Sequence, residues 1–516
     1  MKKTLAAASF SALLAIVASS TSGGFANWNT KYWANEKNFN RISSFNVSDN
    51  LPEGSKSTTK TSSEVVTASE DGKTLMYTDS DLGVVGLVDI SDPAKPKALG
   101  VVELEAEPTG IAALGNNAYI GLNTSESYTN PSGALVQYNL ETRKAVKECD
   151  LGGQPDSVFV SPDGTFLAVA IENERDEEYK NGFIPQLDEE GKQINPPGYV
   201  SFVKLNKKGK IQCNSIKKVD LTGLSEIAPS DPEPEFVAIN DLGETVVSLQ
   251  ENNHLAVIDK DGNVISHFSA GVVKQMAGMD TKKDGAHKFK SKLKNVRREP
   301  DGLTWIDNDH FATANEGDYK HIDPNQAKRG GSRSWTIFKK DGTVVYEDAN
   351  RLERAIAQIG HFQDGRAGKK GVEPESVTYS KINGTPYLFV GAERAGIVAV
   401  YDITELNQPL LTQLLPSGIG PEGFVAIPER GLIASANEKD YNKKEPGLSS
   451  HVTIYQLQDA PASYPHLTNE NGLEFVSWGA ISGMVAGDDG KIYAVNDGTF
   501  KTCLLYTSDA ADDQAC

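Results

Sequence analysis

The sequence is poor in the residues on which common active sites depend. It has 4 cysteines and 8 histidines among 516 residues. It contains no Gly-x-Ser-x-Gly elbow, His-Glu-x-x-His pair or phosphate-binding loop. We interpret His254, beside Glu251, as a packing residue rather than a base. These absences leave no visible candidate for nucleophilic catalysis and no zinc-binding cluster.

Positive charge is also scarce. The 51 lysines and arginines face 70 acidic residues, so the formal net charge is −19. This charge disfavours binding to nucleic acid or to an anionic membrane surface. It fits a soluble exported protein or one that handles cations, and we expect a monomer.

Long apolar runs are absent beyond the first residues. Lys2 and Lys3 precede an apolar run from Leu5 to Val17, and Gly24-Phe25-Ala26 follows as a small-residue cleavage site. Met1–Ala26 is therefore predicted to be a signal peptide of a bacterial protein, periplasmic or secreted. No other stretch is long enough to span a membrane.

A repeated unit dominates the rest of the chain. In residues 153–173, two β-branched runs flank a Pro-Asp-Gly turn, which predicts a strand, a tight turn and a second strand. Asp156 stands where the first strand begins and Glu172 where the second ends. Because a hairpin returns to its starting end, both acids should lie at one edge.

The unit recurs seven times, and each copy continues with a third strand and usually a fourth. Four short strands repeated in this way predict an all-β, seven-bladed β-propeller of the WD40/YVTN-like kind over residues 38–460. Asn38–Val47 resembles the fourth strand that the last unit lacks and could close the ring. Two separate β-domains are the alternative.

Acids recur at both positions of the unit in five of the seven copies. The first ring is predicted to contain Asp156, Glu235, Asp301, Glu375 and Glu422, and the second Glu172, Glu251, Glu316, Glu393 and Glu438. Such carboxylates repel one another unless a cation, an arginine or protons intervene. Oxygen ligands favour Ca²⁺ or Mg²⁺ over zinc. Three interpretations remain open: caps for backbone N–H groups, a bound cation, or a catalytic metal–phosphate site.

Four arginines near these positions could neutralise the rings or bind a phosphate on the metal. They are Arg175, Arg298, Arg333 and Arg394. Residues 280–298 form a basic insertion, and helical spacing over residues 351–360 predicts a short surface helix.

The cysteines fall into two pairs. Cys149 and Cys213 lie in outer segments of successive units and could form a disulfide in an oxidising compartment. Cys503 and Cys516 lie in a tail, residues 503–516, that resembles a translated sequencing adapter and is expected to be non-native. A further strand–turn–strand pattern within residues 470–502 predicts the start of a second, truncated domain, and one hairpin cannot bury a face by itself.

Several stretches between Asn38 and Asp497 carry a resemblance to a known family. They are Gly153-Gln-Pro-Asp-Ser-Val, Ala170-Ile-Glu-Asn-Glu-Arg, Asp231-Pro-Glu-Pro-Glu-Phe-Val, Leu249-Gln-Glu-Asn-Asn-His, Thr313-Ala-Asn-Glu-Gly-Asp-Tyr, Gly371-Val-Glu-Pro-Glu and Leu415-Pro-Ser-Gly-Ile-Gly-Pro-Glu-Gly. The chain resembles exported bacterial proteins named "esterase-like activity of phytase family protein", with an N-terminal choice-of-anchor I type propeller. The resemblance implies that the phytase-like part begins near Trp478 and is nearly all missing here.

The sequence thus predicts an exported propeller that binds a divalent cation and a phosphorylated or ester ligand at an acidic channel mouth. The parent protein would be a metal-dependent hydrolase of phosphoric or other esters. The alternative is a non-catalytic propeller that binds a ligand or acts as a scaffold.

Overall fold

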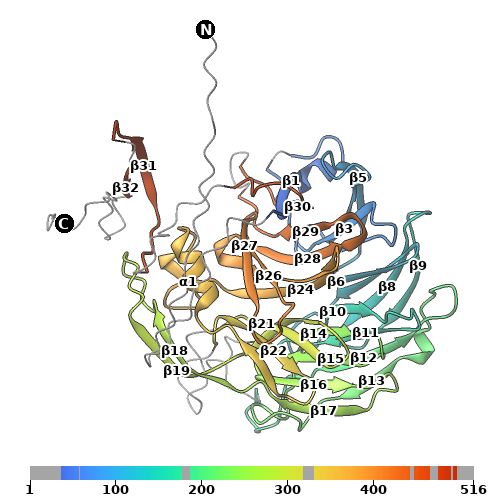
Figure 1. The fold of residues 1–516 in the computed structure, drawn as a ribbon. Coiled ribbons are helices and arrows are strands. Elements are labelled where there is room, and N and C mark those ends of the chain that lie inside the picture. The colour runs from blue at the N-terminus through green and yellow to red at the C-terminus, as the bar shows by residue number, and fades with distance from the viewer. Residues whose placement is uncertain are drawn as a thin grey trace.

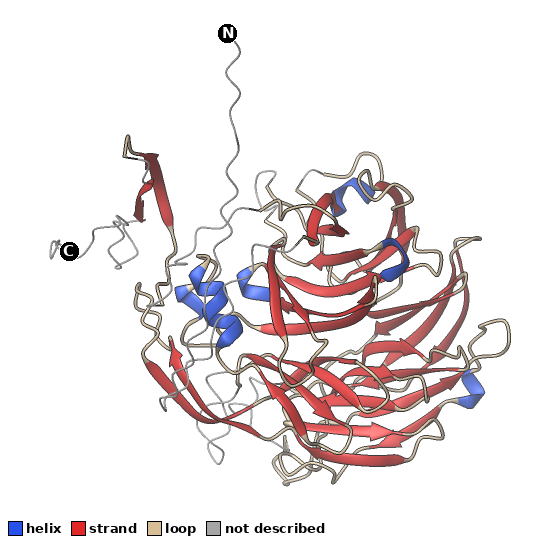
Figure 2. Cartoon of the chain, in the orientation of Figure 1, coloured by secondary structure: helices blue, strands red, loops and turns tan. Residues whose placement is uncertain are grey.

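The computed structural model describes residues 36–56, 58–176, 186–317, 331–441, 447–464, 475–489 and 492–496. The predicted signal peptide and the predicted non-native tail 503–516 lie outside these residues. In the described part, strands predominate and helices are short (Figure 2). No described helix has the length and apolar character that a membrane crossing requires.

Seven four-stranded antiparallel sheets form the body of the molecule, so the prediction of a seven-bladed β-propeller is confirmed (Figure 1). Blade 1 contains β2 (Val66–Ala68), β3 (Thr74–Asp79), β4 (Val84–Asp89) and β5 (Lys97–Glu103). Blade 2 contains β6 (Glu107–Leu114), β7 (Asn117–Asn123), β8 (Gly133–Asn139) and β9 (Lys144–Asp150). Blade 3 contains β10 (Pro155–Val160), β11 (Phe166–Ile171), β12 (Tyr199–Lys204) and β13 (Lys217–Asp220).

The remaining blades repeat this order from the inner strand outward. Blade 4 contains β14 (Pro234–Ile239), β15 (Thr245–Leu249), β16 (His254–Ile258) and β17 (Val264–Ser269). Blade 5 contains β20 (Pro300–Trp305), β21 (His310–Asn315), β22 (Ser334–Lys339) and β23 (Val344–Glu347). Blade 6 contains β24 (Pro374–Ile382), β25 (Thr385–Ala392), β26 (Ile397–Asp402) and β27 (Leu410–Pro416). Blade 7 contains β28 (Pro421–Ile427), β29 (Leu432–Asn437) and β30 (His451–Gln458).

The outer strand of blade 7 comes from the other end of the propeller. β1 (Asn38–Asn46) pairs antiparallel with β30, so the first and last segments share one sheet. This confirms the predicted closure. A ring closed in this way has no free sheet edge at the junction, where an open edge would invite pairing with another chain.

The core lies between blades. The middle strands are apolar on both faces, as in β11, where all six residues are buried, because each face packs on a different blade. Seven clusters of buried side chains each join two neighbouring blades all the way round the ring. A disulfide between Cys149 and Cys213 ties blade 2 to blade 3.

Two insertions leave the propeller from connections between an outer strand and the next inner strand. One carries the hairpin β18 (Val272–Met279) and β19 (Ser291–Arg297), which the sequence analysis did not predict. The other carries α1 (Arg351–Gln358). The helix is confirmed, but its predicted surface position is wrong, because residues 352–357 are all buried.

The other elements are small. Strands β31 (Ile481–Ala486) and β32 (Ile492–Asn496) pair only with each other and lie apart from the propeller in Figure 1. Short 3-10 helices are η1 (Val47–Asn50), η3 (Cys213–Ser215), η4 (Asp364–Arg366), η5 (Glu393–Ala395) and η6 (Pro428–Arg430).

Candidate functional site

The first ring of acids occupies the same position in five blades. Each acid directly follows the proline that opens its inner strand, where a proline lacking an N–H is tolerated. In each of these blades the strand pairing shifts register directly after the proline. A β-bulge of this kind bends the strand and redirects a side chain. The acids concerned are Asp156, Glu235, Asp301, Glu375 and Glu422.

Neighbouring blades contact each other at the positions of the ring acids. Ser157 Oγ donates to the carbonyl of Glu235 over 2.7 Å, and Ser376 Oγ donates to the carbonyl of Glu422. A Cβ on Gly302 would come within 2.5 Å of the carbonyl oxygen of Glu375, so only glycine permits this approach. Inner strands of successive blades therefore touch at the acids.

Blade 1 contributes a sixth acid that was absent from the predicted ring. A Cβ on Gly423 of blade 7 would come within 2.3 Å of the carbonyl oxygen of Glu64. The Glu64 carboxylate accepts hydrogen bonds from Ser62 Oγ at 2.6 Å and from Ser80 Oγ. Glu64 lacks the preceding proline of the other units, which is why its equivalence is weak in the sequence.

The second ring follows the second strands, as predicted. The N–H groups of Glu172, Glu393 and Glu438 donate to carbonyls of Gln154, Glu373 and Gly420, each directly before the proline of the same blade. Glu316 directly follows β21 in the same way, whereas Gln250 holds this position after β15 and Glu251 comes one residue later. The two rings therefore lie at one end of the propeller.

Burial and mutual repulsion raise the pKa values of the first ring. Burial, with repulsion from Glu174 and Glu251, raises the pKa of Asp156 to about 7. Burial, with repulsion from Glu393 and Glu64, raises the pKa of Glu422 to about 8. The pKa values of Glu235, Asp301 and Glu375 are also raised well above their ordinary range, first by burial and then by neighbouring carboxylates. Ionising the carboxylates of the first ring therefore costs free energy.

In the second ring, burial and the charge of Asp156 raise the pKa of Glu172 well above its usual value. Burial also raises the pKa of Glu393, against the lowering effect of Arg394. The carboxylates of blades 3, 4 and 5 thus raise one another's pKa values. The carboxylates of blades 5, 6, 7 and 1 do the same.

Two carboxylate trios stand out in blades 5 to 7. Oxygens of Glu375, Glu393 and Glu422 all lie within 4.8 Å of one another, and so do oxygens of Glu316, Glu373 and Glu375. Glu375 belongs to both trios. Such spacing allows three carboxylates to bind one cation.

Glu373 is a site residue that sequence reasoning missed, and it has equivalents. Glu233, Glu299 and Glu373 each precede the proline of an inner strand and are buried. Each pairs with an arginine: Glu233 with Arg175, Glu299 with Arg297 at 2.9 Å, and Glu373 with Arg394 at 3.0 Å. The signal in the sequence is Glu-Pro followed by an acid. The first acid pairs with an arginine, and the second belongs to the first ring.

Four basic side chains lie beside the acids of the trios. Arg394 lies 2.7 Å from Glu393 and also contacts Glu373. Arg366 pairs with Glu373, Lys370 pairs with Glu316, and Lys439 pairs with Glu438 and lies 3.6 Å from Glu393. Their side chains are between 21 and 31 % exposed, so solvent reaches this mixed cluster.

The four predicted phosphate-binding arginines lie in different surroundings. Arg394 lies in the mixed cluster. Arg175 is buried beside Asp231 and Glu233, and Arg298 pairs with Glu347 at 2.7 Å near the outer strands of blades 4 and 5. Arg333 is completely buried beside Glu353 of α1. Three of the four thus pair with acids outside the trios, and their binding to phosphate stays a prediction.

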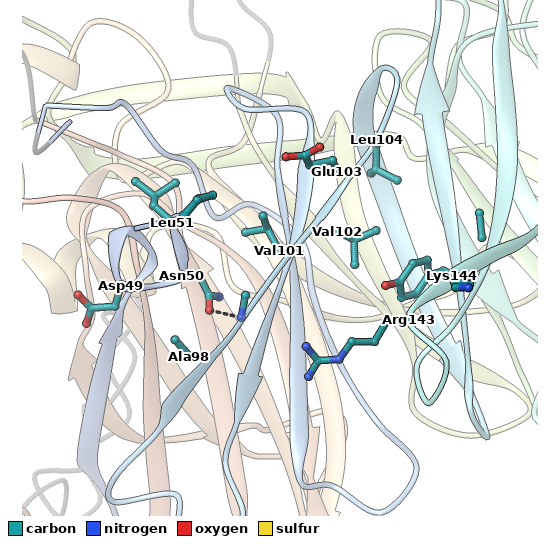
Figure 3. A pocket seen from close by; sticks show the side chains of 14 residues that line it. Asp49, Asn50, Leu51, Ala98, Val101, Val102, Glu103, Leu104, Arg143 and Lys144 are labelled. Carbon is teal, nitrogen blue, oxygen red and sulfur yellow. Dashed lines mark hydrogen bonds between the residues drawn. The ribbon is translucent and has the colours of Figure 1, made fainter. Parts of the chain in front are cut away.

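A separate groove of about 700 Å³ lies on the outer wall, between the outer strands of blades 1 and 2 (Figure 3). It is lined by residues 49–52 of the η1 region, by Ala98 and residues 100–104 in and just after β5, by Tyr138 of β8 and by residues 143–145 near β9. No acid of either ring lines this groove. It is therefore distinct from the channel mouth.

Comparison with known proteins gives a family and a fold. The pattern of the family described as "Choice-of-anchor I domain" matches residues 64–331 and 321–406. No curated protein matches the chain. Among solved structures, the RRP9 WD40 repeats are similar at a TM-score of 0.50 and 9 % identity, over 81 % of this chain and 99 % of that one.

Two further structures are similar at lower scores. Kuenenia stuttgartiensis hydrazine synthase has a TM-score of 0.48 and 15 % identity, over 80 % of this chain and 100 % of that one. Virginiamycin B lyase from Staphylococcus aureus has a TM-score of 0.46 and 11 % identity, over 82 % of this chain and 100 % of that one. At these identities the likeness concerns the fold alone.

Proposed function

The chain belongs to the choice-of-anchor I domain family, and we propose that it is an extracytoplasmic binding propeller whose channel mouth holds a divalent cation, Ca²⁺ first, and a phosphorylated or ester ligand. The family points to a surface-anchored or secreted protein. The observation that carries the proposal is the sharing of Glu375 by two carboxylate trios.

The ligand set favours a hard cation. Every atom that the trios offer is a carboxylate oxygen. Ca²⁺ and Mg²⁺ bind almost entirely to oxygen, whereas zinc sites usually include nitrogen or sulfur ligands. Burial makes the charged form of Glu375 and Glu422 costly, and a divalent cation would offset that cost. Ca²⁺ is the first candidate because it accepts six to eight ligands in irregular geometry.

The basic side chains support an anionic partner for the cation. Arg394 contacts two acids of the trios and remains 31 % exposed. Its planar guanidinium can donate two parallel hydrogen bonds to a phosphate or a carboxylate. A ligand phosphate could bridge the two: the carboxylates would hold the cation, and the phosphate would contact both the cation and Arg394.

Thermal unfolding with Ca²⁺ or with a chelator tests cation binding. Ca²⁺ at about 100 times its dissociation constant stabilises the folded state by about 2.7 kcal/mol, so the wild type should melt several degrees higher. Glu375→Gln removes the shared ligand and should abolish this shift. Glu429→Gln, an exposed acid at the far turn of blade 7, is the matched control and should keep it. Equal shifts in both variants would contradict the proposal.

A metal-dependent ester hydrolase is the second candidate, favoured by the partly exposed Arg394 beside the trios. It predicts turnover of phosphate or carboxylic esters that a chelator abolishes and that Glu375→Gln reduces strongly. Ca²⁺ stabilisation without any turnover would leave the non-catalytic binding propeller.

A further inference from the structure

The hairpin β18–β19 has one apolar and one basic face. Five apolar side chains form a small core on one face, namely Val273, Met276, Met279, Leu293 and Val296. On the other face, Lys294 lies opposite Gln275 and Lys292 opposite Ala277. Both lysines are exposed. Alternation along the strands thus directs the lysines to solvent.

Lysine is concentrated in this hairpin and its turn. Residues 272–296 contain seven lysines and two aspartates, and all seven lysines are exposed. Asp280 is buried, with its carboxylate accepting the N–H groups of Lys282 and Lys288, and Asp284 pairs with Lys288. Among the described residues, no acid pairs with the other six lysines, which are Lys274, Lys282, Lys283, Lys290, Lys292 and Lys294.

The hairpin is held rigidly against neighbouring segments. Its turn places Phe289 against Phe362 at 5.0 Å between ring centroids. The N–H of Gly285 donates to Asp364, and Arg333 donates to the carbonyl of Asp280. The lysines are therefore presented on a fixed surface rather than on a free loop.

The hairpin also lies at the end of the propeller that carries the acids. It occupies the connection from the outer strand of blade 4 to the inner strand of blade 5, and α1 occupies the next such connection. Figure 1 shows β18–β19 and α1 on the same side of the propeller.

We propose that the lysine face of β18–β19 docks on an anionic phospholipid bilayer. Lysine ammonium groups are point charges without the fork that recognises one particular oxyanion, and they suit a plane of mobile phosphates. The net charge of −19 opposes docking. At physiological salt, however, charges more than about 8 Å apart are screened, so the charges on the face nearest the bilayer determine the attraction. The family suggests a surface-anchored or secreted protein.

Sedimentation with phospholipid vesicles tests the proposal, using the full chain. The wild type should bind vesicles containing phosphatidylglycerol but not vesicles of phosphatidylcholine alone, and binding should weaken as salt rises. Each lysine near an anionic surface contributes a factor of about five, so Lys292→Glu with Lys294→Glu should weaken binding at least ~25-fold. Lys207→Glu with Lys208→Glu makes the same charge change in an exposed turn of blade 3 and should leave binding unchanged.

Three results would overturn the proposal. They are no binding to the anionic vesicles, equal losses in both double variants, and binding to duplex DNA or heparin without binding to vesicles. Unchanged melting temperatures of the variants verify that each one is folded. The test needs no Ca²⁺, so its outcome is independent of the proposed cation site.

Discussion

Arg333 Nη2 donates to Glu353 Oε1 over 3.1 Å, and both side chains are completely inaccessible to solvent. Arg333 precedes β22 of blade 5, and Glu353 belongs to α1. The same guanidinium donates to the carbonyls of Asp280 and Ala367, each at 3.0 Å. One arginine therefore joins the propeller to the hairpin, the helix and the loop before β24.

Replacing Arg333 with Met should destabilise the fold by about 3–5 kcal/mol, because it leaves Glu353 buried without its partner. Burial already raises the pKa of Glu353 to about 7, against the lowering effect of Arg333. The loss should therefore be smaller at pH 5, where Glu353 can take up a proton, than at pH 8. Urea unfolding at both values measures it.

The control is an exposed ion pair. Lys60 and Asp81 lie 2.6 Å apart with side chains 63 % and 30 % exposed, so Asp81→Asn should cost less than about 1 kcal/mol. If Arg333→Met costs no more than Asp81→Asn, the buried pair does not hold the insertions.

The acid rings predict how stability depends on pH when a chelator is present. The pKa is raised to about 7 for Asp156 and about 8 for Glu422, so the folded protein binds these protons more tightly than the unfolded chain does. Their contribution is full below the ordinary pKa and is lost as pH rises through 7 and 8. The buried His254 has a pKa lowered to about 4, so it does not change the dependence of stability on pH above pH 6.5.

We therefore expect the melting temperature in a chelator to fall between pH 6.5 and about 8. Saturating Ca²⁺ should flatten the curve, since a bound cation replaces the protons, and Glu422→Gln should reduce the slope. A melting temperature that rises over this range in the chelator would show that the ring acids are ionised without penalty.

The sequence predicted the blades and the ring acids because both follow from local patterns. Short β-branched apolar runs define strands, and an acid after a strand-opening proline recurs in five of the seven blades. The partners of Glu233, Glu299 and Glu373 could not be predicted in this way. Glu299 and Glu373 adopt left-handed backbone angles, φ 50° and 56°, that no sequence pattern assigns to glutamate.

Insertions were the least predictable parts because their burial depends on distant segments. The spacing of α1 predicts one apolar face, but Arg333 and Phe475 cover its polar residues as well: Arg354 stacks on Phe475 at 3.7 Å. In β19, dense lysines concealed a strand whose buried apolar residues are Leu293 and Val296.

Removing the disulfide should destabilise blades 2 and 3. Cys149 and Cys213 close a loop of 64 residues, which corresponds to about 4 kcal/mol of loop-closure entropy in the unfolded chain. Cys149→Ser with Cys213→Ser should lower the free energy of unfolding by a comparable amount in urea. A reductant should destabilise the wild type and leave this variant unaffected; if the reductant acts equally on both, another thiol is responsible.

Phe39 on β1 should be among the most sensitive residues of the ring closure. It is 1 % exposed and makes edge-to-face contacts with Tyr387 and Phe389 of blade 6, each at 5.2 Å between centroids. Gln413 of β27 accepts the Phe39 N–H at 2.7 Å and donates to its carbonyl at 3.1 Å. Phe39→Ala should cost about 3–5 kcal/mol in urea unfolding, because it leaves a cavity between blades 6 and 7.

Phe159→Ala, which truncates a ring that is 37 % exposed on β10, should cost less than about 1 kcal/mol. Equal losses in the two variants would mean that β1 does not close the ring through this contact.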